Sequence, residues 1–181
     1  DATPAANNLP IRIADFSTLA EALDYAARGN TGYNFYTGSV KLYAKLPYAD
    51  LKRDAEALAR RLIDLGASRG SRVAIVADTH PDFMRFFFAC QYAGLVPVPL
   101  PASVHLGGRK AYVSQLERLL SICQADIAMA PDGFLSYLQE AAQNLNMRFL
   151  GSPQDFYDLP EPSIRLHPSE PDEVAYLQYT S

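Results

Sequence analysis

The stretch that decides the fold is Arg72-Val73-Ala74-Ile75-Val76-Ala77, an apolar run that directly follows Gly70 and Ser71. Its apolar residues do not alternate with polar ones, which is typical of a strand covered on both faces and predicts a central parallel strand. The next apolar run, Leu95 to Leu100, contains Pro97 and Pro99. Because proline cannot donate a ladder hydrogen bond, we expect this second strand at an edge or a bend of the sheet.

Helices are expected between and before these two strands. The connecting helix starts near Pro81, because a proline in the first turn sacrifices no intrahelical hydrogen bond, and it stops at Gly94. A long amphipathic helix is predicted from Tyr48 to its stop at Gly66, since apolar residues recur there at steps of four and three. The two helices and two strands therefore alternate.

Smaller elements are predicted nearer the N-terminus. A helix capped by Ser17 or Thr18 should run to about Arg28. The β-rich pieces 33–36 and 40–44, separated by Thr37-Gly38-Ser39, indicate a small β-hairpin. Residues 1–10 are small and polar, carry no secretory signal pattern, and are interpreted as a loose leader.

Strands and helices continue to alternate after residue 101. The expected elements are a helix at 110–123, a strand at 127–130, a helix at 134–145, and strands at 147–150 and 174–179. A proline-rich passage, 153–171, precedes the last strand, and its interspersed aromatic and aliphatic residues favour a packed surface traverse over a free linker. This alternation indicates an α/β fold with a parallel sheet flanked by helices.

Length, charge and cysteine content narrow the class of protein. The 181 residues suffice for one domain with a buried core. A net charge of -4 without any like-charge block argues against a nucleic-acid surface. The most apolar stretch, 83–101, is interrupted by Arg85 and three prolines, so no transmembrane segment is expected. Cys90 and Cys123 lack metal-binding spacing and are interpreted as buried free thiols of a reducing cytoplasm.

Several polar residues are weak candidates for chemistry. Three histidines fall in unrelated settings and suggest no catalytic set: His80, His105 and His167. Four aspartates show no paired-carboxylate pattern and are interpreted as solvated loop acids: Asp126, Asp132, Asp155 and Asp158. Gly107-Gly108-Arg109-Lys110 opens a helix, whose N-terminus attracts anions, but a flexible loop-to-helix junction explains it more simply.

The C-terminus carries the more suggestive pattern. The apolar run Val174-Ala175-Tyr176-Leu177 leads into Gln178-Tyr179-Thr180-Ser181. Hydroxyls that directly follow a strand of a parallel sheet lie where ligands bind. If a glycine-rich turn followed, its backbone N–H groups and these hydroxyls would cradle a triphosphate, although most such endings are ordinary strand ends.

Four segments together carry a family resemblance. Tyr179-Thr180-Ser181 resembles the opening of the phosphate-binding motif of the adenylate-forming, or acyl-activating, superfamily. Leu46-Pro47-Tyr48-Ala49-Asp50-Leu51 is similar to the first core motif, and the stretch from Cys90 to Leu100 is similar to the second. Gly70-Ser71-Arg72-Val73-Ala74 matches a further family pattern, with Ser71 where aspartate is usual.

The resemblance covers residues 33–181 and implies the N-terminal subdomain of an adenylate-forming enzyme. Within the superfamily, the sequence looks most like the fatty acyl-AMP ligases and long-chain acyl-CoA synthetases. Such enzymes form acyl-AMP from ATP and a fatty acid with Mg²⁺. They then pass the acyl group to an acyl carrier protein or to CoA. The resemblance therefore implies these cofactors and partners for a cytoplasmic parent ligase.

Few functional residues carry over from the family. Thr180 and Ser181 match phosphate-binding positions at the start of the loop. The other matched residues are expected to be scaffold, so no catalytic residue and no metal ligand is assigned. The family's later motifs and its C-terminal domain are expected to follow Ser181, so the 181 residues alone should neither catalyse adenylation nor bind a cofactor tightly.

Two other interpretations remain open from the sequence. The chain could be a self-contained flavodoxin-like binding or interaction module in which Thr180 and Ser181 are merely the end. It could also be a regulatory relative that has lost catalysis. Because this architecture hosts many chemistries, the fold alone does not decide among them.

Overall fold

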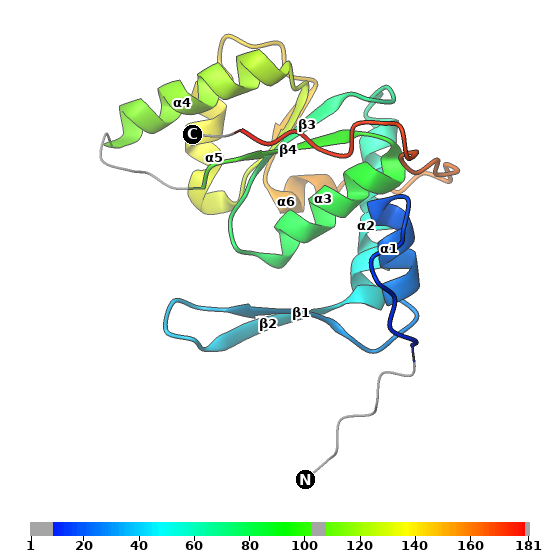
Figure 1. Ribbon diagram of the computed structural model, residues 1–181. Coiled ribbons are helices and arrows are strands. Elements are labelled where there is room, and N and C mark those ends of the chain that lie inside the picture. The colour runs from blue at the N-terminus through cyan, green and yellow to red at the C-terminus, as the bar shows by residue number, and fades with distance from the viewer. Residues whose placement is uncertain (1–8, 103–107, 180–181) are drawn as a thin grey trace.

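A four-stranded parallel sheet forms the centre of the protein (Figure 1), and its strands follow the order β4-β3-β5-β6. The structure is a computed structural model that describes residues 9–102 and 108–179. The strands of this sheet are β3 (Arg72–Val76), β4 (Val96–Leu100), β5 (Ile127–Met129) and β6 (Phe149–Gly151). The helices that flank it are α2 (Tyr48–Asp64), α3 (Pro81–Ala93), α4 (Gly108–Cys123), α5 (Asp132–Ala141) and α6 (Pro153–Tyr157). The predicted α/β architecture is confirmed.

Different helices cover the two faces of the sheet. Val73 and Ile75 of β3 belong to a core shared with α2 and α3, whereas Ala74 and Val76 belong to a second core shared with α4 and α5. Successive residues of a strand point to opposite faces, so an unbroken apolar run serves both cores. The four side chains are fully buried, as the sequence pattern predicts for a central strand.

Strand β4 lies at the edge of the sheet, as its prolines predict. It pairs in parallel with β3, with Val96 N–H donating to Ser71 O at 2.9 Å and Leu100 O accepting from Ala77 N–H at 2.9 Å. Alternate residues of a strand direct their backbone groups to opposite sides, so Pro97 and Pro99 direct theirs away from β3. The free edge of β4 therefore offers carbonyl acceptors at these two positions but no N–H donors.

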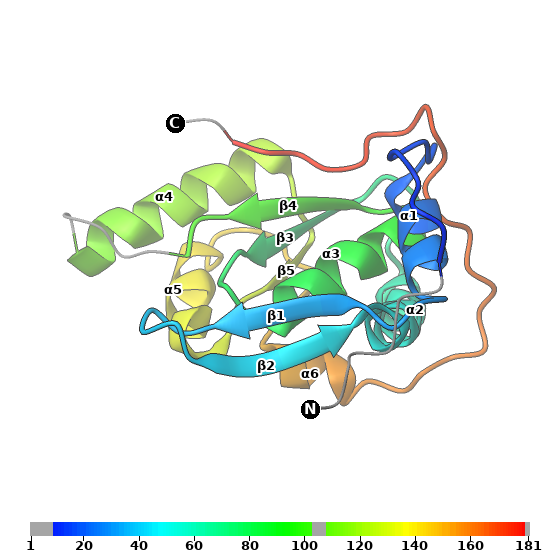
Figure 2. The same ribbon diagram turned by 60° about the horizontal axis from the view of Figure 1, so that its bottom comes forward.

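The prediction of a last strand at 174–179 is wrong. These residues run extended beside β4, as the red segment in Figures 1 and 2 shows, but they form no strand. Leu177 N–H donates to Pro97 O at 3.1 Å. A regular parallel ladder would also need donors from β4 on this side, and Pro97 and Pro99 have none.

A short helix in the proline-rich passage is absent from the predictions. Helix α6 begins after Ser152, whose hydroxyl accepts from Asp155 N–H while the Asp155 carboxylate accepts from Ser152 N–H. This reciprocal capping box, followed by Pro153 at the first helical position, stabilises a helix start. Phe156 is fully buried, with its ring 4.9 Å from Phe86 and 4.7 Å from Phe149 between centroids.

Element boundaries differ from the predictions around α5, β6 and the hairpin, whose second strand is Leu42–Pro47 rather than 40–44. Helix α5 starts two residues before the predicted Phe134, with Asp132 in its first turn, and ends at Ala141 rather than Leu145. Strand β6 starts at Phe149 rather than Met147. Helix α1 (Leu19–Ala26) is capped by Thr18, whose hydroxyl accepts from Glu21 N–H.

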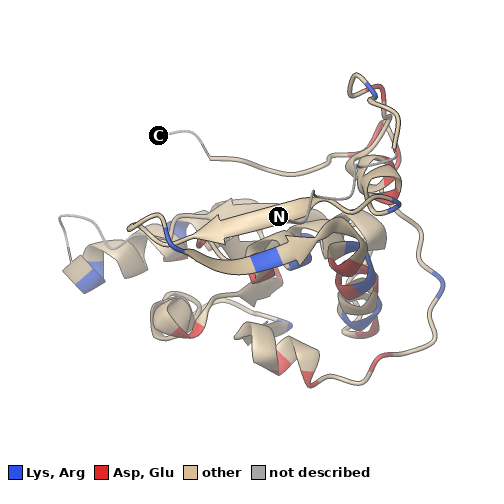
Figure 3. Ribbon diagram, turned by 90° about the horizontal axis from the view of Figure 1, so that it is seen from below, with Lys and Arg blue, Asp and Glu red and all other residues tan. Residues whose placement is uncertain are grey.

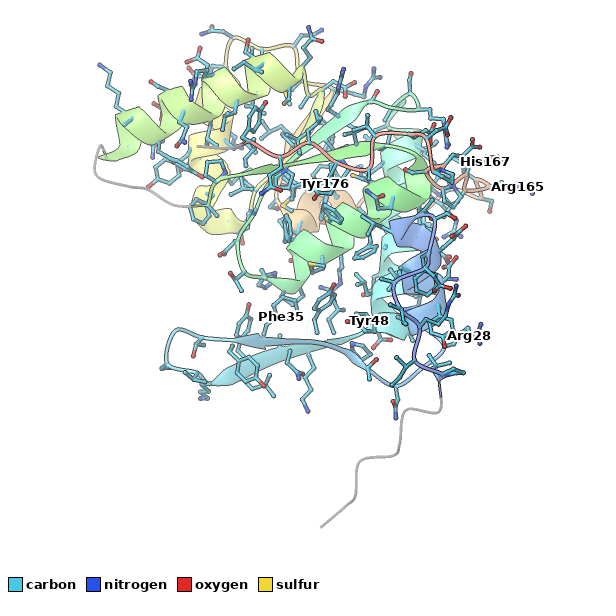
Figure 4. The ribbon with its side chains drawn as sticks, in the orientation of Figure 1. Arg28, Phe35, Tyr48, Arg165, His167 and Tyr176 are labelled. Atoms are coloured by element: carbon cyan, nitrogen blue, oxygen red, sulfur yellow. The ribbon has the colours of Figure 1, made fainter. Side chains whose placement is uncertain are left out.

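The predicted hairpin consists of β1 (Gly32–Tyr36) and β2 (Leu42–Pro47), paired antiparallel. Phe35 points from the hairpin toward the rest of the molecule (Figure 4) and is nearly buried. A register shift next to Phe35 leaves Tyr43 as an extra residue in β2. Its hydroxyl donates to Thr79 O and its ring stacks on His80, so this bulge joins the hairpin to the start of α3.

Charge is distributed unevenly over these elements. The hairpin carries Lys41 and Lys45 and no acidic residue, whereas basic and acidic residues are interspersed along α2 (Figure 3). Within the described residues, no helix has the length and apolar content needed to cross a membrane.

Candidate functional site

The candidate site is a hollow of about 490 Å³ at the carboxyl ends of β3 and β4. In open parallel sheets, ligands bind in the crevice outside the carboxyl ends of the strands. Ala77 follows β3, Leu100 and Pro101 form the end of β4, and Tyr179 closes the hollow from the C-terminal segment. The remaining wall comes from α4 and this segment: Gln115, Arg118, Leu119, Ile122 and Gln178, together with Pro99 of β4.

Tyr179 is fixed at this edge by its own hydroxyl. The phenol donates to the backbone oxygen of Leu119 in α4 at 2.9 Å. Partial burial raises the pKa of Tyr179 to about 12, so the phenol remains a neutral donor at physiological pH. Thr180 and Ser181, the predicted phosphate-binding residues, follow directly but lie outside the described residues.

Arg118 provides positive charge in this hollow. Of the described residues that line it, Arg118 is the only one with a charged side chain. Its guanidinium is exposed and carries five N–H donors in a fixed fork, which suits phosphate or carboxylate oxygens. The amides of Gln115 and Gln178 add neutral hydrogen-bonding groups. The hollow can therefore accept an anionic group.

Arg118 and Gln115 are not among the residues predicted from the sequence. Both lie on an amphipathic helix whose polar residues look like an ordinary solvated face. A signal is nevertheless present, because Gln115, Arg118, Leu119 and Ile122 recur at helical spacing and so share one side of α4. Only the position of α4 beside β4 shows that this side borders the sheet edge.

Arg109, the candidate cation at the start of α4, contacts α5 and does not line the hollow. Its Nε and Nη2 donate to a carboxylate oxygen of Glu140 at 2.9 and 2.6 Å, and the guanidinium lies 4.6 Å from the centroid of Tyr137. Arg109 therefore ties α4 to α5. Gly107 lies outside the described residues, and Gly108 adopts a positive φ of 65° where α4 begins.

The two histidines that the structure describes, His80 and His167, do not come together. His80 caps α3, accepts from Asp82 N–H through Nδ1, and lies at the carboxyl end of β3. His167 lies at the opposite end of the sheet, where its backbone oxygen accepts from Arg69 (Figure 4). His105 lies outside the described residues.

The four aspartates have local structural contacts instead of a shared site. Asp126 pairs with Arg148 at 2.9 Å, Asp155 belongs to the capping box, and Asp158 accepts from Gln154 at 2.7 Å. Asp132 lies in the first turn of α5. Within residues 9–102 and 108–179, no group of three or more metal-binding side chains could hold a metal ion. We therefore assign Mg²⁺ no ligand in this part of the chain.

The two cysteines are buried and free, as predicted. Cys90 lies in α3, where complete burial raises the pKa of its thiol. A neutral buried thiol packs as a small apolar group and is a poor nucleophile. Neither cysteine borders the hollow described above.

Comparison with known proteins identifies the family. The model of the AMP-binding enzyme family matches residues 23–181, which is most of the chain. The chain belongs to the AMP-binding enzyme family. This membership confirms the resemblance drawn from the sequence motifs and replaces the alternative of a flavodoxin-like module.

Relatives of this AMP-binding chain are acyl-activating enzymes by name. A protein of Caulobacter vibrioides, provisionally named acyl-CoA synthetase, is 43% identical over 180 residues, covering 99% of this chain and 31% of that protein. The medium-chain-fatty-acid--[acyl-carrier-protein] ligase JamA of Moorena producens is 28% identical over 176 residues, covering 92% of this chain and 29% of JamA. The chain therefore spans about a third of the length of the curated relatives that it matches.

A solved structure supports the same family and fold. A protein from work on fatty acyl-adenylate ligases of E. coli and L. pneumophila superposes with a TM-score of 0.89 at 43% identity. The match covers 95% of this AMP-binding chain and 31% of the solved chain. The sheet, its helices and the hairpin thus have the arrangement of the corresponding part of an adenylate-forming enzyme.

Proposed function

We propose that these 181 residues are the N-terminal part of a ligase that forms acyl-AMP from ATP and a fatty acid and passes the acyl group to an acyl carrier protein or to CoA. The observation that carries this proposal is the family match, which extends to Ser181, beyond the segment that brings Tyr179 to the carboxyl edge of the sheet. Thr180 and Ser181 are proposed to bind ATP phosphates there.

Acyl-AMP formation requires positive charge and hydrogen-bond donors around the ATP phosphates at this edge of the sheet. The fatty acid carboxylate attacks the α-phosphorus, a new P–O bond forms, and the bond to pyrophosphate breaks. Negative charge develops on the leaving pyrophosphate, so donors and cations preorganised around the phosphates stabilise the transition state. Arg118 and the hydroxyls of Thr180 and Ser181 are this chain's proposed contributions. ATP is used with Mg²⁺, whose ligands we expect outside the described residues.

The relatives support a fatty acid as the acyl substrate and leave two acceptors. JamA is named for transfer to an acyl carrier protein, and the Caulobacter relative is named for CoA. The solved neighbour comes from work on fatty acyl-adenylate ligases. We favour a medium- or long-chain fatty acid as substrate and an acyl carrier protein as acceptor.

The isolated 181-residue chain is proposed to be inactive. The hollow contains one cation and no metal cluster among its described residues. Charge neutralisation of a triphosphate takes more than one cation, so the remaining groups would come from the rest of the ligase.

We also propose a cytoplasmic location for the ligase. The two cysteines of this chain are free and buried, and free thiols favour a reducing compartment.

Mass spectrometry tests this proposal directly. The full-length protein is incubated with ATP, Mg²⁺ and fatty acids of graded chain length, with the 181-residue chain as a parallel sample. We expect acyl-AMP and pyrophosphate from the full-length protein only. Addition of holo acyl carrier protein should discharge the acyl-AMP to a thioester, with CoA as the competing acceptor. No acyl-AMP with any fatty acid would contradict the proposal.

A further inference from the structure

The segment 167–177 is held against the sheet mainly by side chains. Among the described residues, the Leu177 N–H to Pro97 O contact is the one backbone hydrogen bond between this segment and β4. Pro97 and Pro99 remove the donors that a regular ladder would use on this edge of the sheet. Other groups must therefore fix the path of the chain toward Tyr179.

Arg69 supplies most of the missing attachment. Its Nε and Nη2 donate to the two carboxylate oxygens of Glu173, each at 2.6 Å. Its Nη1 also donates to His167 O at 2.8 Å, and its Nη2 to Pro168 O at 2.9 Å. We call this set of contacts the Arg69 clasp. Parallel charge-assisted bonds of this kind are strong and fix orientation, because the planar guanidinium matches a carboxylate edge.

Gly94 makes room for the Arg69 clasp. Its φ is 66°, in the left-handed region, where it caps α3. A Cβ at this position would lie 2.4 Å from Arg69 Nη1 and 3.2 Å from His167 O. A side chain at this position would therefore push the guanidinium away from the end of α3 and from residues 167–168.

Gln91 provides a second, buried attachment. Its side chain is 1% exposed, and its amide donates to Ala175 O at 2.6 Å. Its backbone oxygen accepts from Ser169 N–H at 2.8 Å. Tyr176 adds an apolar contact, with its ring 5.8 Å from that of Phe87 on α3 (Figure 4). Residues 167–177 are thus anchored at three successive points, namely Arg69, Gln91 and Pro97.

We propose that Arg69 and Gln91 are positioning residues for ATP. They hold residues 167–177 along the donor-poor edge of β4, so that the chain brings Tyr179, which directly precedes Thr180 and Ser181 in sequence, to the carboxyl edge of the sheet. This role rests on the proposed function of Thr180 and Ser181 as phosphate-binding residues. Displacement by about 1 Å of a positioned group can lower a catalytic rate by about a hundredfold, so loss of these distant anchors is expected to weaken the contacts between Thr180, Ser181 and ATP.

The test uses the full-length protein and two readouts. Hydrogen exchange measures the protection of residues 169–177, and steady-state kinetics separates KM for ATP from KM for the fatty acid. Arg69→Gln and Gln91→Leu are the test variants. Arg72→Gln is the matched control, because Arg72 borders a neighbouring hollow with Gly70 and Glu173 but its side chain has no hydrogen bond or ion pair to a described residue.

We expect Arg69→Gln to lower the protection of residues 169–177, which keep their contacts to Gln91 and Pro97. KM for ATP should rise about tenfold, which is less than the roughly hundredfold effect that a misplacement of about 1 Å can have. KM for the fatty acid should stay within about twofold, and Arg72→Gln should resemble the wild type. Arg69→Lys should give an intermediate KM for ATP, because lysine restores the charge without the fork. Glu173→Gln combined with Arg69→Gln should be no worse than Arg69→Gln alone.

Two results would overturn the positioning role. One is unchanged exchange protection in Arg69→Gln, and the other is an equal rise of KM for both substrates. Failure of the proposed function has a different signature: the wild-type protein forms no acyl-AMP while the exchange difference between wild type and Arg69→Gln persists.

Discussion

Gly94 combines a left-handed backbone conformation at the end of α3 with close contact to the Arg69 side chain. Left-handed backbone costs a residue with a side chain about 1–2 kcal/mol, and a Cβ would also displace Arg69 from 2.4 Å away. We predict that Gly94→Ala lowers the free energy of unfolding by at least about 1–2 kcal/mol and releases residues 167–173 to proteolysis. Urea unfolding and limited proteolysis measure the two effects.

Gly133 offers a matched control for this substitution. It lies near the start of α5, and a Cβ there meets nothing within 4 Å. Gly133→Ala should leave stability unchanged or raise it by up to about 1 kcal/mol, because alanine is the better helix former. Equal destabilisation by the two substitutions would contradict the account of Gly94.

Glu173 makes the Arg69 clasp sensitive to acid. The hydrogen bonds from Arg69 hold the pKa of this carboxyl below its ordinary value. Because the pKa is lower in the folded state, the stabilisation is present above the unfolded pKa and is lost as the pH falls through the folded pKa. We predict that protection of residues 169–177 is constant near neutrality and declines on acidification below the ordinary range of glutamate. Hydrogen exchange across pH, with Glu173→Gln as the pH-insensitive comparison, measures this decline.

At the scale of elements, α6 shows how a five-residue helix contributes to a core. Phe156 is fully buried between Phe86 of α3 and Phe149 of β6. Truncation of a buried phenylalanine to alanine typically costs about 3–5 kcal/mol, and Phe156→Ala should reach this range in urea unfolding. Tyr36→Ala, at a side chain 49% exposed on the hairpin, should change stability by less than about 1 kcal/mol. Similar costs for both would contradict the assignment of Phe156 to the core.

The elements also show which parts of the fold can be predicted from sequence. The unbroken apolar run of β3 predicts a central, buried strand, and the prolines of β4 predict an edge strand. Both predictions are confirmed. Residues 174–177 have a similar apolar pattern, but they can form a strand only if the neighbouring strand, β4, offers backbone N–H donors. Pro97 and Pro99 remove those donors on this side of β4. Local pattern cannot show which edge a segment lies beside.

The start of helix α6 can be predicted from the sequence, whereas the hollow lined by Arg118 cannot. The Ser152 capping box is a recognisable start signal, although the five-residue helix is too short to show a helical period. Arg118 looks like any exposed arginine until α4 is placed beside β4. The resemblance to the family located Thr180 and Ser181 in the sequence, whereas the long-range anchors Arg69 and Gln91 emerge only from contacts across about a hundred residues of chain.

At the scale of the whole molecule, the sheet, the Arg69 clasp and the hollow form one connected arrangement. Arg69, which precedes β3, and Gln91 of α3 hold the segment that brings Tyr179 to the carboxyl end of β4, where Arg118 lines the hollow. Thr180 and Ser181, which follow Tyr179 in sequence, are proposed to bind the phosphates of ATP.

Acyl-dependent ATP–pyrophosphate exchange by the full-length protein tests this claim most directly. Thr180→Ala combined with Ser181→Ala is compared with Ser114→Ala, a change on the exposed face of α4. Loss of two hydrogen bonds to a charged ligand should cost about 1.5–3 kcal/mol each, so KM for ATP should rise at least about tenfold in the double variant. Ser114→Ala should match the wild type. An unchanged KM for ATP in the double variant, with exchange intact, would contradict the account.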